Sequence, residues 1–465
     1  MTIHLSLTSR GVLSRLVKQG LSFKRYISNI NSPFQDDLTD LDLDEFGLGD
    51  FRHYKESPQV SEYKKKQLKD LLYDNEESEI PTPTQAGKLE SIAARNEPTV
   101  FVSKLSDPYL NLAIEDYVYN KIPIAKDSPF KAQRLMFYTN SPCVVIGKNQ
   151  NPWKEVNLPK MNECGIPLIR RKSGGGTVVH DLGNVNYSFM TTKQDFDRFK
   201  FVDLIVDSIN RSNITSTKIE VNHRGDIVAR NGNKELKISG SAYKLSRGKS
   251  YHHGTMLLNS DLQRLKQVLH RDVVELGVVD ASKTIDSVKA KVTNLQIPQE
   301  SFVDLVSKGF KLEYGISDAS STELKNEDDP NKEFNEMMGL TDFVSAVKSA
   351  NTFEIDESVE LPEEVFTVAD ELKSWEWKFG RTPSFTHTLE NAKHGICIKL
   401  TVDMGIIKSI EWGDANSHYS PTLWNEVSGK LCGIQYRGDS IEQSLGGDRS
   451  THKLGSWLHK AIDGV

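Results

Sequence analysis

Three consecutive glycines, Gly174–Gly176, lie in the stretch RRKSGGGTVVHDLGN that begins at Arg170. Without Cβ atoms, the backbone there can adopt positive φ and bring its amides close to a ligand, and such amides can hold a phosphate or a carboxylate. The stretch lacks the GK[ST] of a P-loop, and Thr177–Val179 favours a strand where a GxGxxG loop would open a helix. It is therefore either a hairpin connection or an anion-binding loop, to which Arg170 and Arg171 could add charge-assisted hydrogen bonds.

Length and composition are those of a soluble protein with two or three domains. The chain has 465 residues, and a domain has about 100–200. No run approaches the roughly 18 apolar residues of a membrane-spanning helix. We therefore expect no membrane partner. The net charge of −6 argues neither for nor against a nucleic-acid partner, but the basic residues are scattered and form no stripe, so we expect no nucleic acid as partner. Four widely spaced cysteines without a CxxC pair suit neither a zinc site nor a disulfide framework, and they indicate a reducing compartment.

The first 35 residues have the composition of a mitochondrial transit peptide. No acidic residue precedes Asp36, and hydroxylated residues are frequent. The basic residues are Arg10, Arg15, Lys18, Lys24 and Arg25. Apolar residues recur at helical spacing between Leu13 and Leu21, so an apolar face would lie opposite the basic one. We predict import into the mitochondrial matrix, with a disordered basic tail as the alternative.

Composition predicts five segments along the chain. They are a transit peptide at 1–35, an acidic and largely disordered linker at 36–96, a catalytic domain at 97–316, an acidic linker at 317–341 and a C-terminal domain at 342–465. The first linker is too polar to bury a core, apart from one helix expected near Tyr63–Tyr73. The second linker, rich in Ser, Asn and Asp, is typical of a connection between domains.

The sequence between the two predicted linkers indicates a mixed α+β fold. Asp107 and Pro108 indicate the start of a helix, because an acidic cap precedes a proline at the first helical position. Strands are expected at Arg134–Thr139, Cys143–Ile146, Thr177–His180, Tyr187–Met190, Asp226–Ala229, Leu236–Ser239 and Thr255–Leu258, and helices at Val202–Asn210 and Leu262–His270. Strands and helices do not alternate regularly, so we expect an α+β sheet with helices on one face rather than a doubly wound sheet.

Several further motifs accompany the glycine stretch. They are DPYLNLAIEDY (Asp107–Tyr117), GKNQNPWKEVN (Gly147–Asn157), KISGSAYK (Lys237–Lys244), HHGTMLL (His252–Leu258) and SVKAKVTNL (Ser287–Leu295). With them the chain resembles the lipoate–protein ligase family, of the lipoate ligase A and lipoyltransferase kind and of fungal mitochondrial type. The hallmarks of that family are RRxSGGGxVxHDxGN and KxSGSA. The resemblance covers Val100–Leu295 and extends more weakly to Ser374–Pro383 (SWEWKFGRTP).

The resemblance implies a fold and an activity. The fold would be a mixed-sheet catalytic domain of the biotin and lipoate ligase type, followed by a small α/β accessory domain that closes over the site. ATP would convert lipoate to lipoyl-AMP, with Mg2+ on the phosphates. The ε-amine of an acceptor lysine would then attack the lipoyl group and release AMP. The implied acceptors are the lipoyl domains of 2-oxoacid dehydrogenase complexes and the glycine-cleavage H protein, both mitochondrial.

The resemblance also assigns residues. Lys237 would be catalytic, contacting both the lipoyl carbonyl and the adenylate phosphate. The nucleotide would lie against Arg171, Gly176, Thr177, Val178, Val179 and Lys237, and lipoate against Gly175, Gly176, His180 and Lys237. Asp226 would be the magnesium ligand, although the family usually has Asn where Gly225 stands. Because no HExxH spacing is present, we expect a buried, hydrogen-bonded role for His180, His252 and His253.

The same fold also supports other functions. One is an acyltransferase that moves octanoyl or lipoyl groups from acyl-CoA or lipoyl-AMP without an ATP step. Related octanoyltransferases form a thioester on a cysteine where this chain has Lys249. Cys143 lies in an apolar strand and Cys164 outside the motifs, so a cysteine acyl-enzyme is disfavoured, whereas direct transfer from an acyl-CoA stays open. A non-catalytic binder of lipoyl domains and a biotin ligase fit the motifs less well.

Overall fold

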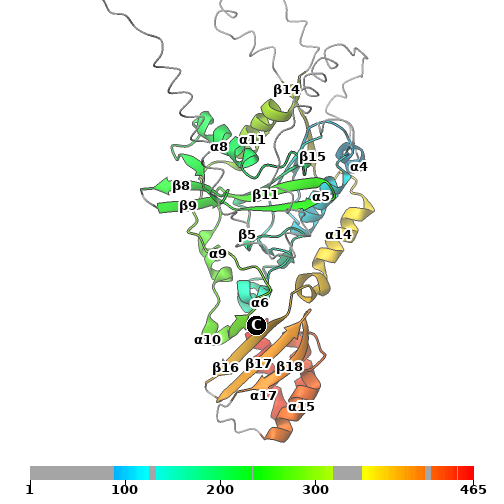
Figure 1. Cartoon of the computed structure of the whole chain (residues 1–465), viewed down its shortest axis with the longest axis vertical. Coiled ribbons are helices and arrows are strands. Elements are labelled where there is room, and N and C mark those ends of the chain that lie inside the picture. The colour runs from blue at the N-terminus through cyan, green and yellow to red at the C-terminus, as the bar shows by residue number, and fades with distance from the viewer. Residues whose placement is uncertain are drawn as a thin grey trace, which may run out of the picture. The chain divides into compact units, whose positions relative to one another are not determined.

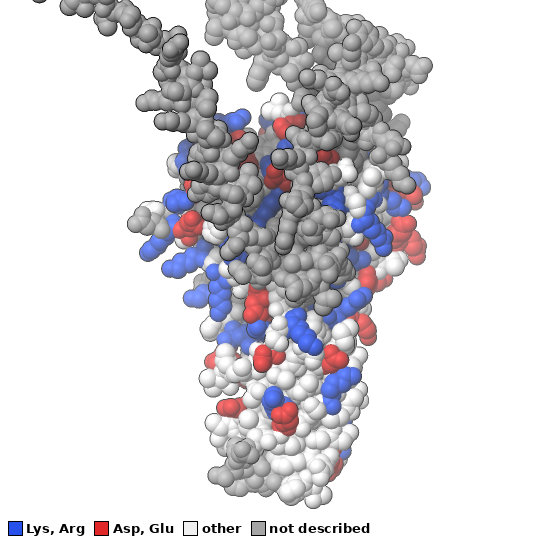
Figure 2. Space-filling model, in the orientation of Figure 1, with Lys and Arg blue, Asp and Glu red and all other residues white. Residues whose placement is uncertain are grey.

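The computed structural model describes residues 88–124, 132–232, 234–317, 348–392, 394–413, 420–447 and 449–464. The predicted transit peptide, the helix expected near Tyr63–Tyr73 and almost all of the linker at 317–341 lie outside the described residues. Within the described residues, no helix is both long enough and apolar enough to cross a membrane. Side chains of both charge signs are spread over the face drawn in Figure 2.

The largest sheet has six strands in the order β10-β11-β6-β2-β1-β15 (Figure 1). Their bounds are Thr99–Ser103 (β1), Arg134–Tyr138 (β2), Asn184–Thr192 (β6), Ser241–Ser246 (β10), Lys249–Leu257 (β11) and Asn351–Ile355 (β15). Strand β1 is parallel to both of its neighbours, and the other pairs are antiparallel. The expectation of a mixed α+β sheet is therefore confirmed.

Helices cover both faces of this sheet, so the expectation of helices on one face is wrong. The helices are α5 (Pro108–Lys121) on one face and α8 (Lys200–Ser212) with α11 (Gln299–Tyr314) on the other (Figure 1). Leu135 and Phe137 of β2 pack with α8 and α11, whereas Met136 packs with α5. Successive side chains of a strand point to opposite faces. A central strand that is buried along its whole length, as β2 is, therefore needs cover on both sides.

Helix α5 begins as its sequence predicts. The carboxylate of Asp107 accepts hydrogen bonds from the backbone amides of Tyr109 and Leu110, and Pro108 occupies the first turn. This satisfies two of the amides that a helix start leaves without partners. A short helix before it, α4 (Leu89–Ala93), packs into the same core. Packed structure thus begins inside the segment 36–96 that composition predicts to be largely disordered.

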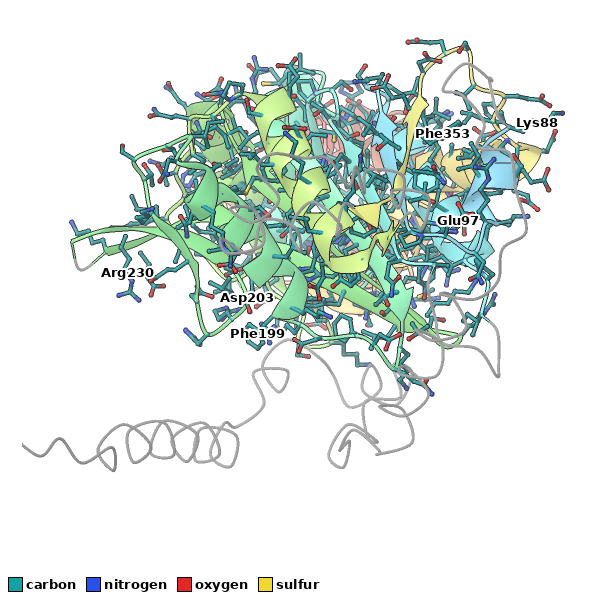
Figure 3. The ribbon with its side chains drawn as sticks, turned by 90° about the horizontal axis from the view of Figure 1, so that it is seen from above. Lys88, Glu97, Phe199, Asp203, Arg230 and Phe353 are labelled. Carbon is teal, nitrogen blue, oxygen red and sulfur yellow. The ribbon has the colours of Figure 1, made fainter. Side chains whose placement is uncertain are left out.

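Two small three-stranded sheets carry the motif residues. One has the order β4-β3-β5 and the other β7-β8-β9. Their bounds are Cys143–Ile146 (β3), Leu168–Arg170 (β4), Val178–His180 (β5), Ile219–Val221 (β7), Ile227–Asn231 (β8) and Lys234–Ser239 (β9). Each strand predicted from the sequence overlaps an observed one. Among the strands of the largest sheet and these two small sheets, β1, β4, β7, β10 and β15 were not predicted. Arg230 lies near the outer end of the β8–β9 hairpin (Figure 3).

A four-stranded antiparallel sheet forms the smaller C-terminal layer, in the order β12-β16-β17-β18. Its strands are Val278–Asp280 (β12), Phe385–Asn391 (β16), Ile396–Asp403 (β17) and Ile406–Trp412 (β18). Its helices are Pro421–Leu431 (α15), Gly438–Leu445 (α16) and Arg449–Ile462 (α17). Strand β12 belongs to the sequence before the second linker, so the chain enters this sheet twice.

The structure distributes the region 342–465 differently from the predicted boundary. Strand β15 pairs with β1 of the largest sheet, and helix α14 (Glu363–Lys373) packs with α5 through Val365, Ala369 and Leu372. Residues up to 373 thus complete the larger layer, and the strands of the smaller sheet resume at Phe385. The two-stranded pair of β13 (Ile316–Ser317) and β14 (Lys348–Ser349) lies at the ends of the segment 318–347.

The smaller sheet shares a hydrophobic core with the helices that follow β3. These are α6 (Pro152–Glu155) and α7 (Leu158–Glu163). Trp153 of α6 stacks on Phe385 at 5.2 Å between ring centroids and contacts Tyr436 edge-on at 5.0 Å. An aromatic group of this size contributes strongly to a core.

We predict that Phe302→Ala destabilises the fold strongly. Phe302 of α11 is fully buried and meets Phe137 of β2 at 6.0 Å between ring centroids. Truncating such a side chain typically costs about 3–5 kcal/mol. The free energy of unfolding from urea denaturation measures the loss. The control is Leu312→Ala on the same helix, where the side chain is 62% exposed and a change below about 0.5 kcal/mol is expected. Equal losses in the two variants would contradict this packing.

Candidate functional site

The glycine loop between β4 and β5 is packed tightly against backbone. Gly175 has φ +86°, and a Cβ there would lie 2.9 Å from Nη2 of Arg171 and 3.1 Å from Cβ of Ala242. A Cβ on Gly147, at the end of β3, would lie 2.0 Å from the carbonyl oxygen of Gly175. The glycines are therefore needed for both the conformation and the close approach.

Arg171 holds the carbonyls of this loop. Its buried guanidinium donates hydrogen bonds to the carbonyl oxygens of Gly174 at 3.1 Å, Gly176 at 2.8 Å and Val145 at 3.3 Å. It also donates to Oγ of Ser173 at 3.0 Å. Burial lowers the pKa of Arg171 to about 10, which still leaves the group charged at neutral pH. The residue lies at the predicted nucleotide loop, but its donors bind protein oxygens rather than pointing to a phosphate.

Arg170 binds a different set of carbonyls. Its guanidinium donates to Lys148 at 2.7 Å, to Gln150 at 2.8 Å and to Lys378 at 2.7 Å. Its own carbonyl accepts from the indole N–H of Trp377 at 2.7 Å. Lys378 and Trp377 belong to a π-helical turn, Glu376–Gly380. Arg170 therefore joins the segment after β3 to the chain that leads into the smaller sheet.

A buried relay of side chains fixes the first residue of the loop. Oγ of Ser173 lies 2.8 Å from Nε2 of His253, and Nδ1 of His253 lies 3.1 Å from a carboxylate oxygen of Glu115. Because a carboxylate only accepts, Nδ1 of His253 carries a proton and donates it to Glu115. Sequence reasoning did not single out Glu115. A signal was available, since this glutamate lies between Ile114 and Tyr117 on the apolar stripe of a predicted helix.

Ser287, in the motif Ser287–Leu295, fixes the other end of the loop. Its Oγ accepts hydrogen bonds from the backbone N–H of Thr177 at 2.8 Å and from the amide of Gln150 at 2.9 Å. Its own N–H donates to the carboxylate of Glu155, and burial raises the pKa of that carboxyl above its ordinary value. A Cβ on Gly176 would lie 3.3 Å from Oγ of Ser287. The glycine loop is thus held at both ends by side chains.

Strand β5 presents its residues to two different sides. Val178 packs with the core beneath α5, whereas Val179 packs with the core of the smaller sheet. The two valines, both predicted to lie against the nucleotide, therefore face different sides of β5. His180 is buried, and its Nδ1 accepts from the amide of Asn140 at 2.9 Å. Burial lowers the pKa of His180 to about 3, so the ring is neutral, and the expected buried, hydrogen-bonded role is seen for this residue.

Lys237 lies beside a β-bulge. On β8, Ile227 faces Ser239 and Val228 faces Lys237, so Ile238 is an extra residue on β9. A bulge of this kind re-aims neighbouring side chains. Ile238 is fully buried, while Lys237 extends over Gly240, where a Cβ would lie 3.0 Å from its Cε and 3.2 Å from its Nζ. Gly240 therefore leaves room for the ammonium group.

Asp226 is the ion-pair partner of Lys237. Its Oδ1 lies 2.9 Å from Nζ, with 13% of the Asp226 side chain and 27% of the Lys237 side chain exposed. A turn holds the carboxylate in place: Oδ1 of Asn222 accepts from the amides of Arg224 and Asp226, and Gly225 has φ +80°. A positive φ favours glycine at this position.

Asp226, the predicted magnesium ligand, is paired with Lys237 in the structure. Among the residues that the structure describes, no group of three or more His, Cys, Asp or Glu side chains could hold a metal ion. Mg2+ usually binds through one or two carboxylates, together with substrate phosphates and water. One carboxylate is too few for an ion that protein ligands alone would hold.

Two segments connect Lys237 with the glycine loop. Along β10, Gly240 packs under the ammonium group and Ala242 touches Gly175, and two residues span at most about 7 Å. Along the motif that begins at Ser287, the carbonyl of Lys291 accepts from the amide of Lys237 at 2.8 Å, and the amide of Thr293 donates to the carbonyl of Lys237 at 2.9 Å. The fold therefore brings the two motifs of the sequence to one place.

His252 differs from the other two histidines. Its ring lies 4.6 Å from that of Tyr243 between centroids and also contacts Tyr187 and Phe201. Among the described residues neither of its nitrogens has a hydrogen-bond partner. The expectation of a hydrogen-bonded role is therefore wrong for this residue. Successive side chains of β11 point to opposite faces of the sheet, so His252 lies on the face opposite His253, away from Glu115 and Ser173.

The cysteines give no support to a covalent acyl-enzyme. Cys143 is fully buried, and burial raises the pKa of its thiol well above the ordinary value, so it remains protonated. Cys164 is exposed and follows helix α7. At the position of the octanoyltransferase cysteine, Lys249 donates a hydrogen bond to the carbonyl of Asn120.

Known proteins resemble this chain in sequence and in structure. A model of the lipoyl protein ligase A/B catalytic domain matches residues 107–311. A Schizosaccharomyces pombe protein named "Putative lipoate-protein ligase A" is 34% identical over 329 residues, covering 71% of this chain and 82% of the relative. The crystal structure of P. falciparum LipL1 in complex with lipoate is 22% identical with a TM-score of 0.45, covering 78% of this chain and 99% of that one. A bipartite lipoate protein ligase of Thermoplasma acidophilum, solved with its E2 lipoyl domain, is 21% identical with a TM-score of 0.42, covering 61% and 96%.

Two neighbouring glycines should respond differently to alanine. Gly175→Ala places an L-residue at φ +86° with its Cβ against Arg171 and Ala242, which we expect to cost at least about 1–2 kcal/mol. Gly174→Ala meets no atom within 4 Å and should leave stability nearly unchanged. The free energy of unfolding of both variants checks this. A similar loss in the two variants would show that the loop is not fixed as described.

Acid should destabilise the fold through His252. Burial lowers the pKa of His252 to about 3, whereas the unfolded chain protonates the ring near pH 6.5. The stability that this group contributes is complete above pH 6.5 and is lost as the pH falls toward 3. Between pH 7 and 5 we expect a loss of about 2 kcal/mol from this residue. His252→Phe should flatten the dependence of the unfolding free energy on pH. His394→Phe, at an exposed position, should not, and an unchanged slope for His252→Phe would contradict the assignment.

Proposed function

Since the chain belongs to the lipoate–protein ligase family, we propose that it attaches lipoate to the ε-amine of a specific lysine on lipoyl domains. In the first step a carboxylate oxygen of lipoate attacks the α-phosphorus of ATP, and pyrophosphate leaves. In the second step the acceptor amine attacks the acyl carbon of lipoyl-AMP and AMP leaves. Both transition states gather negative charge at the acyl carbonyl and the α-phosphate, so a fixed positive charge between them lowers both barriers.

The observation that carries this proposal is the position of Lys237. Its ammonium group extends over Gly240, and Gly240 and Ala242 connect it to the glycine loop. A fixed cation beside an anion-binding loop suits a substrate that carries an acyl carbonyl and a phosphate next to each other. Asp226, at 2.9 Å, holds the ammonium group in place before substrates arrive, which limits reorganisation during the reaction.

The glycine loop is the proposed nucleotide site. Arg171 binds the carbonyls of Gly174 and Gly176, and its buried charge adds a positive potential at the loop. In this proposal Arg171 supports the nucleotide site through Gly176 and Thr177 rather than by binding a phosphate. A magnesium ion carried by the phosphates would neutralise part of their charge, with Asp226 as the side chain able to bind it.

Lipoate itself needs an apolar surface for its tail. We place it beside Gly175, Gly176 and His180, since the neutral ring of His180 carries no charge that the tail would have to desolvate. Val178 faces the same core as α5 and is the valine that suits this side. Val179 faces the smaller sheet and is better suited to packing there.

Compartment and acceptors are part of the proposal. The basic, acid-poor composition of residues 1–35 supports import into the mitochondrial matrix. The acceptors proposed there are the lipoyl domains of 2-oxoacid dehydrogenase complexes and the glycine-cleavage H protein. Both depend on a lipoyl-lysine, which is the product of the proposed reaction.

A donor comparison tests the reaction. An apo lipoyl domain is offered lipoate with ATP, lipoyl-AMP or octanoyl-CoA, and intact-mass measurement follows its modification. We expect modification with the first two donors. Activity with octanoyl-CoA and none with ATP would replace the ligase by the acyltransferase. Absence of modification with every donor would favour a non-catalytic binder.

Lys237→Ala should lower the rate by about 10²–10³, because one preorganised donor to the transition state is removed. The matched control is Lys234→Ala on the same strand, where the side chain is exposed and no change is expected. Rates with preformed lipoyl-AMP separate the second step from the first. Full activity of Lys237→Ala would exclude the proposed mechanism.

A further inference from the structure

Three lysines lie on the segment that borders Lys237. Lys283, Lys289 and Lys291 are all exposed. Among the described residues, none of the three has an ion-pair partner, whereas Asp286, the acidic residue of the same segment, pairs with Lys154 at 2.6 Å. The segment therefore presents unneutralised positive charge beside the site. We call residues 283–291 the basic edge.

The basic edge is anchored from its inner side. Oγ of Ser287 binds the amide of Thr177, and the carbonyl of Lys291 binds the amide of Lys237. The groups that face the site are thus a hydroxyl and a backbone carbonyl, while residues 288–291 are all exposed. The position of the edge is fixed even though its lysine side chains extend into solvent.

Nearby charges on the β8–β9 hairpin are arranged differently. Arg230, labelled in Figure 3, pairs with both Glu220 and Glu235. Figure 2 shows Lys and Arg side chains gathered on the side of the molecule that bears this hairpin in Figure 1. Lys234 of the hairpin is also exposed. The basic edge differs because it carries three exposed lysines within nine residues and its Lys291 is hydrogen-bonded to the backbone of Lys237.

We infer that the basic edge is a docking surface for an acidic face of the acceptor protein. The inference rests on the proposed function, because the acceptor must bring a lysine amine to the acyl group beside Lys237. That approach places one cation near Lys237, Lys289 and Lys291, and like charges oppose it. Carboxylates around the acceptor lysine offset this repulsion and pair with the basic edge. Exposed lysines of this kind mainly speed encounter and select partners.

A nucleotide phosphate is a less suitable ligand for the lysines of the basic edge than an acidic protein face. Phosphate sites commonly use backbone amides that are held in place, and the glycine loop already offers such amides. The ammonium groups of Lys289 and Lys291 end long, exposed, flexible side chains that are strongly hydrated. Such side chains suit the rim of a protein interface better than a fixed catalytic position.

The test compares the full chain with its Lys289→Glu/Lys291→Glu variant at saturating lipoate and ATP. The substitutions leave the backbone bond between Lys291 and Lys237 in place. We expect the KM for the apo lipoyl domain to rise about tenfold or more and to depend less steeply on salt. Adenylate formation, measured by pyrophosphate exchange without acceptor, should keep its KM for ATP and for lipoate.

Two further variants make the result specific. Lys453→Glu/Lys460→Glu makes the same change of net charge at exposed positions of α17 and should leave the acceptor KM unchanged. Lys289→Gln/Lys291→Gln removes the charges without reversing them and should have a smaller effect in the same direction. If circular dichroism shows that the Glu variant fails to fold, the Gln variant replaces it in the measurement of the acceptor KM.

Three outcomes would overturn the docking surface. They are an unchanged acceptor KM, an equal rise in the α17 control, and a raised KM for ATP without acceptor, which would assign the lysines to the nucleotide. Failure of the proposed function is seen separately, as absence of pyrophosphate exchange in the unmodified chain. In that case the acceptor KM is measured with octanoyl-CoA as donor.

Discussion

A buried guanidinium holds the glycine loop in shape. Arg171 binds the carbonyls of Gly174, Gly176 and Val145, and a buried charge is tolerable only when its donors find partners in this way. The carbonyls of Gly174 and Gly176 therefore turn toward Arg171, whereas the amide of Thr177 at the end of the loop donates to Ser287. Arg171 thus shapes the site without needing to touch the substrate.

The ion pair of Lys237 and Asp226 is the second fixed point. A bulge at Ile238 aims the lysine, and a turn around Gly225 aims the carboxylate. The two fixed points are joined through β10 and through the segment after Ser287. Such rigidity suits a reaction in which positioning and preplaced charge supply most of the rate.

The smaller sheet is tied to the same region. Trp153 stacks on Phe385, Arg170 binds Lys378, and β12 joins the sheet from the sequence that precedes the basic edge. A lid movement of this sheet, as the family resemblance implies, would have to break these contacts or pivot around them. The π-helical turn at Glu376–Gly380 carries one of these contacts, since Arg170 donates to the carbonyl of Lys378 within it.

The sequence by itself determined the local elements and the identity of the motifs. The cap at Asp107 and the strands around the glycine loop follow from residue type and spacing, which act over a few residues. The role of Lys237 follows from the family resemblance of the motifs. Only the tertiary structure decided what the motifs contact. It turned Arg171 toward loop carbonyls, left His252 without a partner, placed Val178 and Val179 on opposite sides and moved β15 into the larger sheet. These outcomes depend on which distant segments share a core, and packing between such segments is not encoded in any local pattern.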